Sequence, residues 1–286
     1  MQRRRIAVSS LVSLAALVGL VLTAPAARAA GKDRLTAELS AEEIVDKALN
    51  RGAVGFQQGT ATLKMTIVTT KGDAKERTLE ISAMKDGDGM LKSMVKFSKP
   101  ADVSGTAFLV VQKKDALPDQ YVYVPKAKVV RRIAAGNATS TFFGSDFTYA
   151  DLMPLPVSEK DKVAVQKLED GTVGGQAVFV LQVTPKVEGS PYGRVVAHVH
   201  KELLVPLKIE FFDPQGQPLK SLLVRKLQKI NICPENSKKK DGCDQHVPME
   251  VEMKAAVGSR TELVLEKVDP NAKLTEADFT EEAMQR

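Results

Sequence analysis

The feature that most constrains the fold is a short alternation of apolar and polar residues that recurs along most of the chain. Leu63, Met65 and Ile67 alternate with threonine and lysine, which is the pattern of a β-strand with one buried face. A Lys-Gly-Asp turn at 71–73 leads to a second run of this kind at 79–83. Because turns rather than helices separate most of these runs, the chain is expected to form an antiparallel sheet.

The same reasoning predicts further strands at 91–97, 106–112, 120–124, 128–133, 162–169, 177–184, 194–201, 207–212, 219–229, 247–255 and 260–268. A capping box of Ser40 and Glu43 opens a helix to about residue 51, and Thr275 can cap a short helix near the end. About a dozen strands in one open sheet would leave costly edges, so the sheet is expected to curl toward closure. No compositional break or repeat divides residues 30–286, which are expected to form a single domain.

Residues 1–29 have the pattern of a cleaved secretory signal peptide. Three arginines at 3–5 precede an apolar stretch at 6–22, and Ala-Arg-Ala at 27–29 is a small-x-small cleavage site. An uncleaved membrane anchor is the alternative, but the apolar stretch is short for a membrane span. The mature chain is therefore expected to be exported and to work as a soluble periplasmic protein, by a Sec or a twin-arginine route.

The net charge argues against nucleic acid as a partner. The whole sequence carries a formal charge of +6, of which the four arginines of the leader supply most, so that +2 is left for residues 30–286. Binding to phosphate backbones needs a dense cationic face, which so nearly neutral a chain lacks. Its 43% hydrophobic and 27% charged residues also exclude wholesale disorder.

The two cysteines flank a polar segment between two strand-like runs. In an oxidising compartment, Cys233 and Cys243 are expected to form a disulfide that closes a hairpin. The alternatives, a metal pair and a redox couple, lack nearby ligands and C-x-x-C spacing.

Aromatic residues are concentrated in residues 142–152, which we call the aromatic loop. The chain has 10 Phe and 4 Tyr in all, and four of them lie here: Phe142, Phe143, Phe147 and Tyr149. Ser145 or Asp146 is expected to cap a short helix in this segment. The loop either plugs one end of the sheet with its aromatic side chains or forms a lid over a cavity.

The same region carries a family resemblance. The residues concerned are Tyr121, Tyr123, Pro125, Lys128, Arg131, Arg132 and Ile133, followed by Phe142, Gly144, Ser145, Asp146, Phe147, Tyr149, Asp151 and Leu152. In this order they resemble the outer-membrane lipoprotein-sorting protein family, a branch similar to the LolA/LolB carriers. The likeness extends over most of residues 40–280 and includes the runs at 247–253 and 274–279.

The resemblance implies a mainly β fold: an incomplete, half-closed antiparallel β-barrel, with a few short helices covering the open side and an apolar cavity between. It implies a periplasmic carrier that binds acyl chains of a lipoprotein or another lipid. An inner-membrane transporter and an outer-membrane acceptor would be its partners. The resemblance implies neither a cofactor nor catalysis.

A carrier is physically sensible, because exposing an acyl chain of about fourteen methylenes to water costs roughly 11 kcal/mol. Alternation selects the residues expected to line the cavity together with the aromatic loop: Met65, Ile67, Ile81, Phe211, Met249 and Met253. These rows could instead fill a closed core, and the protein would then be a non-transporting envelope adaptor whose aromatic loop docks a protein.

Arg131 and Arg132 are neighbours on one expected strand, so their side chains point to opposite faces. We expect one of them to orient the lid or a lipid headgroup, by meeting a phosphate, Asp146 or Asp151. Two solvated arginines that protect a sheet edge are the alternative.

Signals of catalysis are weak. His198 and His200 share a strand face, yet zinc normally takes a third ligand, and His246 is the only other histidine. The sequence contains no nucleophile elbow, H-E-x-x-H motif or P-loop. We therefore predict no catalytic residue and no metal site, and a metal-dependent hydrolase is a distant third possibility.

The disulfide prediction is tested by mass spectrometry of the exported protein with and without reduction. The unreduced protein should contain no free thiol and a peptide pair joined through Cys233 and Cys243. Replacing both by Ser should lower the free energy of unfolding by about 2–3 kcal/mol, because the short loop is no longer closed in the unfolded chain. Two free thiols in the exported protein would contradict the prediction.

Overall fold

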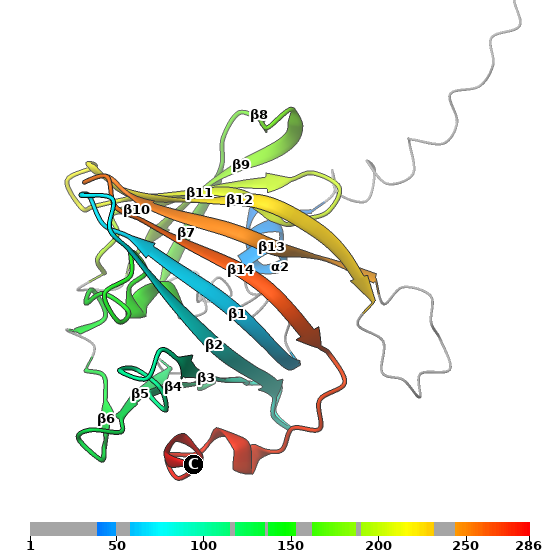
Figure 1. The fold of residues 1–286 in the computed structure, drawn as a ribbon. Helices are drawn as coiled ribbons and strands as arrows, with labels where there is room; N and C mark the ends of the chain where they lie inside the picture. The colour runs from blue at the N-terminus through cyan, green and yellow to red at the C-terminus, as the bar shows by residue number, and fades with distance from the viewer. Residues whose placement is uncertain are drawn as a thin grey trace, which may run out of the picture.

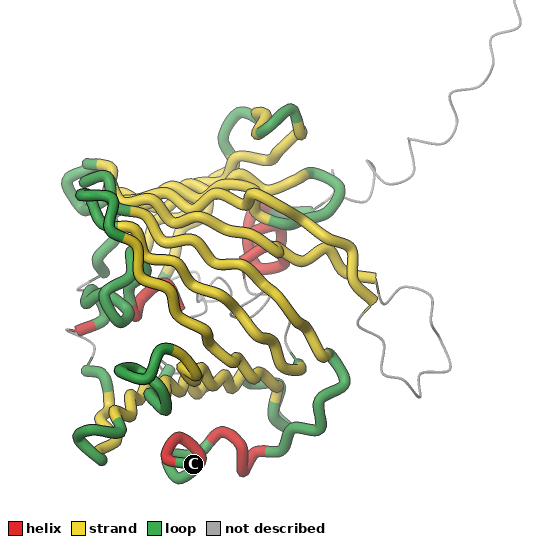
Figure 2. The backbone as a smooth tube through the Cα atoms, in the orientation of Figure 1, coloured by secondary structure: helices red, strands yellow, loops and turns green. Residues whose placement is uncertain are grey.

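The computed structural model describes residues 39–49, 58–114, 118–134, 137–152, 162–186, 190–231 and 244–286. The expected signal peptide and both cysteines lie outside these ranges. Within the described residues, one α-helix and a single 14-stranded system of antiparallel strands account for most of the regular structure (Figures 1 and 2).

The helix is α2 (Ala41–Leu49). The strands are β1 (Gly59–Val68), β2 (Ala74–Lys85), β3 (Leu91–Lys99), β4 (Ala107–Val111), β5 (Asp119–Val124), β6 (Val129–Arg132), β7 (Val163–Lys167), β8 (Gly171–Val173), β9 (Gln176–Pro185), β10 (Arg194–His200), β11 (Pro206–Phe212), β12 (Pro218–Asn231), β13 (Asp244–Ala255) and β14 (Arg260–Asp269). Three 3₁₀ helices complete the series among the described residues: η2 (Tyr149–Leu152), η3 (Glu276–Phe279) and η4 (Ala283–Gln285).

The predicted strands are confirmed with small differences at their ends, and only β8 was not expected. The short helix expected after Thr275 is a 3₁₀ turn, η3, whose capping box joins Thr275 and Asp278. The capping box of Ser40 and Glu43 also forms, with the Ser40 N–H 2.8 Å from the Glu43 carboxylate.

One long-range pairing organises the sheet. Neighbouring strands are consecutive in sequence along β6-β5-β4-β3-β2-β1 and along β14-β13-β12-β11-β10-β9, whereas β1 pairs with β14 and thereby joins the two series. In that pairing Leu63 lies opposite Leu265, and Met65 lies opposite Leu263. β6 and β7 end the order and do not pair with each other, so the sheet curls without closing (Figure 1). The expected fold class, a half-closed antiparallel barrel, is confirmed.

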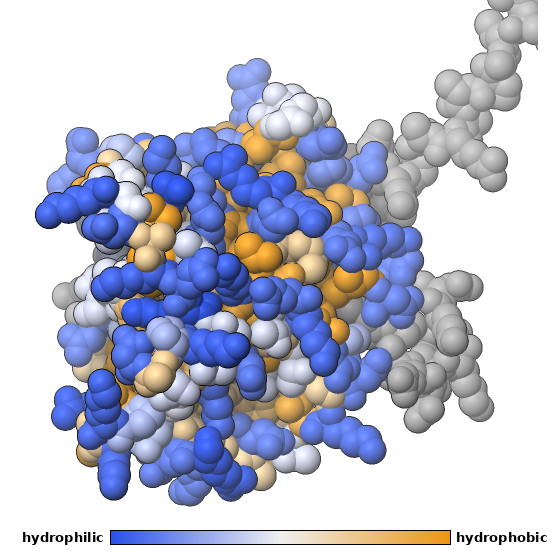
Figure 3. All heavy atoms as spheres, viewed as in Figure 1, coloured by the Kyte–Doolittle hydropathy of each residue, from blue (hydrophilic) through white to orange (hydrophobic). Residues whose placement is uncertain are grey.

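The concave face of the sheet carries the main hydrophobic core. Ile44, Val45 and Ala48 of α2 belong to the same buried cluster as the inward residues of nearly all the long strands. The helix packs against β7 and β10, inside the curve of the sheet (Figures 1 and 2). Figure 3 shows that hydrophilic side chains cover much of the outward surface, with smaller apolar areas between them.

A second, smaller core lies on the opposite face of β3–β5. Met94 and Leu109 of this face are covered by Phe279 and Met284 from the C-terminal 3₁₀ helices. The Lys96 ammonium group also donates to the Ala283 carbonyl oxygen at 2.7 Å. β4 is therefore buried on both faces, which explains why its sequence is apolar throughout.

The small core predicts a stabilising role for the C-terminal segment. Met284 is fully buried, so Met284→Ala should lower the free energy of unfolding by about 2–4 kcal/mol. The exposed neighbour Glu281 gives the control, because Glu281→Ala should change stability by less than about 0.5 kcal/mol. Urea denaturation measures both, and equal midpoints for the two variants would contradict this role.

Candidate functional site

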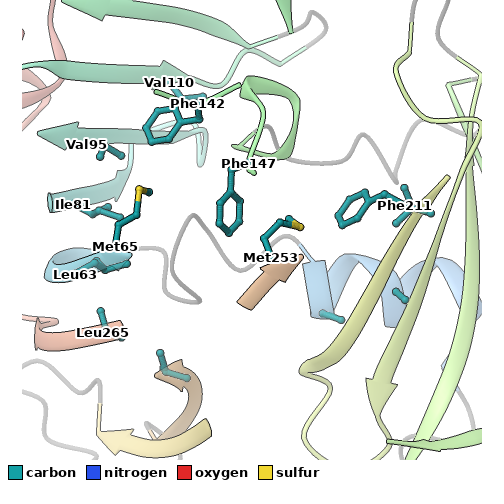
Figure 4. Packing of buried hydrophobic residues seen from close by; sticks show 14 of the residues in the cluster. Leu63, Met65, Ile81, Val95, Val110, Phe142, Phe147, Phe211, Met253 and Leu265 are labelled. Atoms are coloured by element: carbon teal, nitrogen blue, oxygen red, sulfur yellow. The ribbon is translucent and has the colours of Figure 1, made fainter. Parts of the chain in front are cut away.

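The candidate site is the concave apolar face together with the aromatic loop that lies against it. Met65, Ile67, Ile81, Phe211 and Met253 are all buried in this cluster. Met249 is partly buried and packs against the cluster. Figure 4 shows Met65, Ile81, Phe211 and Met253 on different strands around Phe142 and Phe147 of the aromatic loop.

The aromatic loop folds as a small hairpin of its own. An isolated bridge joins Thr141 and Thr148, and the Phe142 N–H donates to the Phe147 carbonyl oxygen at 2.7 Å. Phe143 and Gly144 both adopt positive φ, at 50° and 75°, which reverses the chain sharply. The turn sends Phe142 and Phe147 toward the sheet, where both are buried.

The loop and the sheet share an aromatic cluster. The ring of Phe142 lies 5.3 Å from that of Phe108 in β4, edge to face, and 6.0 Å from that of Phe97 in β3. The partly buried Phe143 and Tyr149 extend the cluster, with ring centroids 4.8 Å from Phe97 and 5.4 Å from Phe108 respectively. Edge-to-face pairs of this kind stabilise the contact beyond their buried area.

Arg77 fastens the tip of the loop. Its Nη1 donates to the Phe143 carbonyl oxygen at 2.5 Å, and its guanidinium lies 5.7 Å from the centre of the Phe97 ring. Burial lowers the pKa of Arg77, and the charge of Asp102 opposes that shift. A charged donor thus caps a backbone carbonyl that the loop itself leaves unpaired.

Asp146 fixes the middle of the loop to β14. Its carboxylate accepts hydrogen bonds from the hydroxyls of Ser259 and Thr261, the latter at 2.6 Å. Its backbone N–H donates to Thr261 Oγ1 at 2.9 Å. Thr261 is fully buried, so these bonds form away from water, where an unpaired polar group would be costly.

Asp151 and Lys220 form a buried ion pair at the end of the loop. The Lys220 ammonium lies 2.5 Å from the Asp151 carboxylate, and only 7% and 5% of the two side chains are exposed. Lys220 also donates to the Asp146 carbonyl oxygen at 3.3 Å. The Tyr192 hydroxyl donates to Asp151 at 2.5 Å, and the Thr148 N–H does so at 2.7 Å. Burial, together with the Asp151 charge, raises the pKa of Tyr192 far above its usual range.

The prediction that Ser145 or Asp146 caps a short helix in the loop was wrong. Asp146 and Ser145 do not begin a helix; the only helical turn there is η2 (Tyr149–Leu152). Ser145 closes the preceding turn instead, because its hydroxyl donates to the Phe142 carbonyl oxygen at 2.6 Å. The bonds from β14 to Asp146 decide the local structure, and they come from residues more than a hundred positions away.

Among the described residues, neither Arg131 nor Arg132 pairs with a loop carboxylate, and contact of one of them with a lipid phosphate stays a prediction. Arg132 pairs with Asp119, and both Asp146 and Asp151 are engaged by other residues. Arg131 lies opposite Val122, a residue of the concave core, so it occupies the concave side of β6, at the exposed edge. The alternation that places the two arginines on opposite faces does hold.

His198 and His200 each lie within hydrogen-bonding distance of a neighbouring side chain. His198 Nε2 lies 2.8 Å from the Glu210 carboxylate, and His200 Nε2 lies 3.3 Å from the Gln176 side-chain oxygen. Within the part of the chain that the structure describes, no three His, Cys, Asp or Glu side chains are grouped as metal ligands.

A small cavity of about 200 Å³ lies at the far ends of β1, β2 and β14. Its lining includes Thr60, Ser82 and Asp269 and is mainly polar, so it differs from the apolar hollow expected beside the aromatic loop. On the concave face the loop itself covers the apolar side chains.

Sequence reasoning missed Arg77, Tyr192, Lys220, Ser259 and Thr261 as residues of this site. Tyr192, Ser259 and Thr261 gave no such signal, since each meets the loop only through the fold. Arg77 and Lys220 carried one, because Arg77 lies opposite Met65 in the inward register of β2 and Lys220 occupies the inward register of β12 together with Leu222. A lysine at a position where alternation predicts burial points to a buried partner.

Comparisons with known proteins bear on this architecture. A family model described as "Uncharacterized protein" matches residues 89–286. Among solved structures, a domain described as an outer membrane lipoprotein-sorting protein from Vibrio parahaemolyticus is 28% identical, with a TM-score of 0.74. The alignment covers 86% of this chain and 98% of that one.

Two further structures share the fold at lower identity. A DUF1329 family protein from Desulfovibrio piger is 24% identical with a TM-score of 0.73, and the alignment covers 86% and 98% of the two chains. A LolA superfamily protein from Nitrosomonas europaea is 16% identical with a TM-score of 0.64, with 86% and 99% covered. No curated protein matches the sequence at a significant level. Among the described helices, none has the length and apolarity needed to cross a bilayer.

The buried ion pair predicts a large effect of removing one partner. Lys220→Ala leaves the Asp151 charge buried without its cation, so the free energy of unfolding should fall by about 3–5 kcal/mol. The double variant Lys220→Met with Asp151→Leu should recover only part of this loss, because no unpaired charge is left but the Tyr192 hydroxyl and the Thr148 N–H lose their acceptor. The exposed pair of Lys226 and Glu250 gives the control, for which Lys226→Ala should cost less than about 1 kcal/mol. If urea denaturation shows equal losses of unfolding free energy for Lys220→Ala and Lys226→Ala, the stabilising role of the buried ion pair is contradicted.

Proposed function

Because the chain belongs to a LolA-like protein family, we propose that it is a carrier of acyl chains between the membranes of the cell envelope. The acyl chains of a lipoprotein or another lipid would bind on the concave face of the sheet. The observation that carries the proposal is the apolar lining of that face beneath a separate, clasped loop.

The lining suits acyl chains in its chemistry. Its inward residues are aliphatic, aromatic and methionine side chains, and Met65, Met249 and Met253 place flexible thioethers along it. Such a surface offers dispersion contacts over its apolar side chains, while the inward polar residues Arg77, Thr261 and Lys220 hold the loop and would need new partners once it leaves. An acyl chain should bind such a surface no more tightly than it partitions into a membrane interior, which would allow the cargo to be released.

The aromatic loop takes the place of the cargo in the described state. Phe142 and Phe147 cover the concave side chains, with only 3% and 7% of their own surface exposed. An acyl chain would bind where these rings now pack, so binding would displace the loop. The polar contacts of Arg77, Asp146 and Asp151 lie along the loop and would define its closed position.

The setting proposed for this activity is the periplasm, reached through the signal peptide predicted at residues 1–29. There the carrier would receive cargo from an inner-membrane transporter and deliver it to an outer-membrane acceptor. Similarity to a lipoprotein-sorting domain supports this direction of transport.

A second function is favoured by the same burial of Phe142 and Phe147. If the loop never leaves the sheet, the core is permanently filled, and the protein would act as a non-transporting adaptor whose outer surface binds an envelope protein. The two functions differ in whether lipid accompanies the protein.

Native mass spectrometry of the protein purified from the periplasm, followed by lipid extraction, separates these functions. Carriage predicts a mass increment that matches a lipid or lipoprotein acyl group in near-stoichiometric amount. A protein that never contains lipid, even when it is isolated together with its membranes, would overturn carriage in favour of the adaptor.

Loop displacement makes a separate prediction for Arg77. Arg77→Met removes the donor to the Phe143 carbonyl while keeping the packing on Phe97, so the closed state should weaken by about 1.5 kcal/mol. The affinity for a fluorescent fatty acid should then rise about tenfold in a titration, because the loop competes with the ligand. The exposed Lys254, on the outward face of β13 beside the inward Met253, provides the control Lys254→Met, which should leave affinity unchanged. An unchanged or lower affinity in Arg77→Met would show that the loop does not compete.

A further inference from the structure

The β5–β6 hairpin forms a projecting lip at one edge of the sheet. β6 ends the strand order, and Figure 1 shows the hairpin at the lower left, at the edge of the sheet beside β4. Its turn is tight, because the Val124 carbonyl oxygen accepts from the N–H groups of Ala127 and Lys128. The projecting residues are thus held in a fixed arrangement.

Two apolar side chains are exposed on the lip. Val124 and Val129 pair across the hairpin and are 38% and 44% exposed, among the most exposed large apolar residues of the described chain. They share a strand face with Val122, which belongs to the concave core. The apolar concave surface therefore continues to solvent at this edge.

Three cations surround these valines. Lys126, Lys128 and Arg131 are exposed, and none of them has an ion-pair partner among the described residues. Arg132 differs, because it is engaged by Asp119 on the other face. Figure 3 shows hydrophilic side chains with apolar atoms between them in this corner of the molecule.

The nearby acids leave the lip cationic. Asp119 is engaged by both Lys113 and Arg132. Asp102 lies in the 100–105 turn that approaches Pro125, and its charge acts on Arg77. Glu281 of the C-terminal segment acts on Tyr121, on the opposite face of the hairpin from the two exposed valines.

We propose that this lip docks the protein on the surface of an anionic phospholipid membrane. Lysine and arginine would meet the headgroup phosphates, and the valines would enter the boundary between headgroups and acyl chains. Each cation near an anionic surface contributes about a fivefold gain in partitioning, so three cations supply about a hundredfold.

The lip adjoins the aromatic loop. Docking at the lip would therefore place the loop near the membrane during the proposed carrier function, on which this inference rests. The Gln120 side chain of β5 donates to the Tyr149 carbonyl oxygen at 3.0 Å, and its own backbone carbonyl accepts from the Ile133 N–H. β6 is followed in sequence by the segment that leads into the loop. Docking would therefore bring the covered apolar face to the membrane from which cargo enters or leaves.

The test is co-sedimentation of the exported protein with vesicles of pure phosphatidylglycerol and of pure phosphatidylcholine. Partitioning should be strong for phosphatidylglycerol, weak for phosphatidylcholine, and reduced by salt because the cations are exposed. The triple variant Lys126→Gln, Lys128→Gln and Arg131→Gln should lose about a hundredfold in partitioning to phosphatidylglycerol.

A matched triple variant controls for net charge. Lys85→Gln, Lys267→Gln and Lys273→Gln remove three exposed cations near the opposite end of the strands and should cost less than about fivefold, the effect of one cation. Equal losses in both triples would mean that overall charge, not the lip, drives association, and would overturn the proposal. Equal wild-type binding to both kinds of vesicle would overturn it as well.

A fatty-acid titration on the same proteins separates this inference from the carrier function. If the lip variant binds the fluorescent fatty acid like the wild type but loses vesicle association, both proposals stand. If the wild type docks through the lip yet binds no acyl chain, docking stands and carriage fails. If acyl binding is intact and the lip variant still associates fully, carriage stands and docking at the lip fails.

Discussion

The pairing of β1 with β14 is the contact on which the rest of the structure depends. It joins two series of hairpins into one curled sheet, and it places Leu63 and Met65 beside Leu265 and Leu263 on the same concave face. Without it, each series would be an open sheet whose apolar face had no opposing apolar surface to pack against. The curvature creates an apolar surface larger than α2 covers, and the aromatic loop covers a further part of it.

The loop is held by two kinds of interaction with different consequences. Its aromatic rings bind the sheet through contacts that an acyl chain could replace with little loss, because both are apolar. Its polar contacts to Arg77, Thr261 and Lys220 cannot be replaced by an acyl chain. The rings thus define where cargo would bind, while the polar contacts set how readily the loop gives way.

Much of the fold follows from the sequence, because strand periodicity and turns are local properties. The rows at Met65, Ile81 and Met253 were placed on the buried face by alternation alone. The polar contacts that hold the loop were not predictable, because Asp151 and Lys220 are 69 residues apart and Asp146 and Thr261 are 115 apart. Such partners meet only after the strands are arranged in the sheet. These long-range contacts can then override a local tendency, as where Asp146 bonds to β14 instead of capping a helix.

The position of β14 near the end of the chain also shapes the order of assembly. β1 can pair with β2 at once, but its other edge finds a partner only when almost the entire polypeptide is present. Contacts between residues so distant in sequence form late and slowly, since a long segment must first be brought together. A chain that emerges N-terminus first must therefore keep one side of its central strand unpaired until the last hairpin arrives.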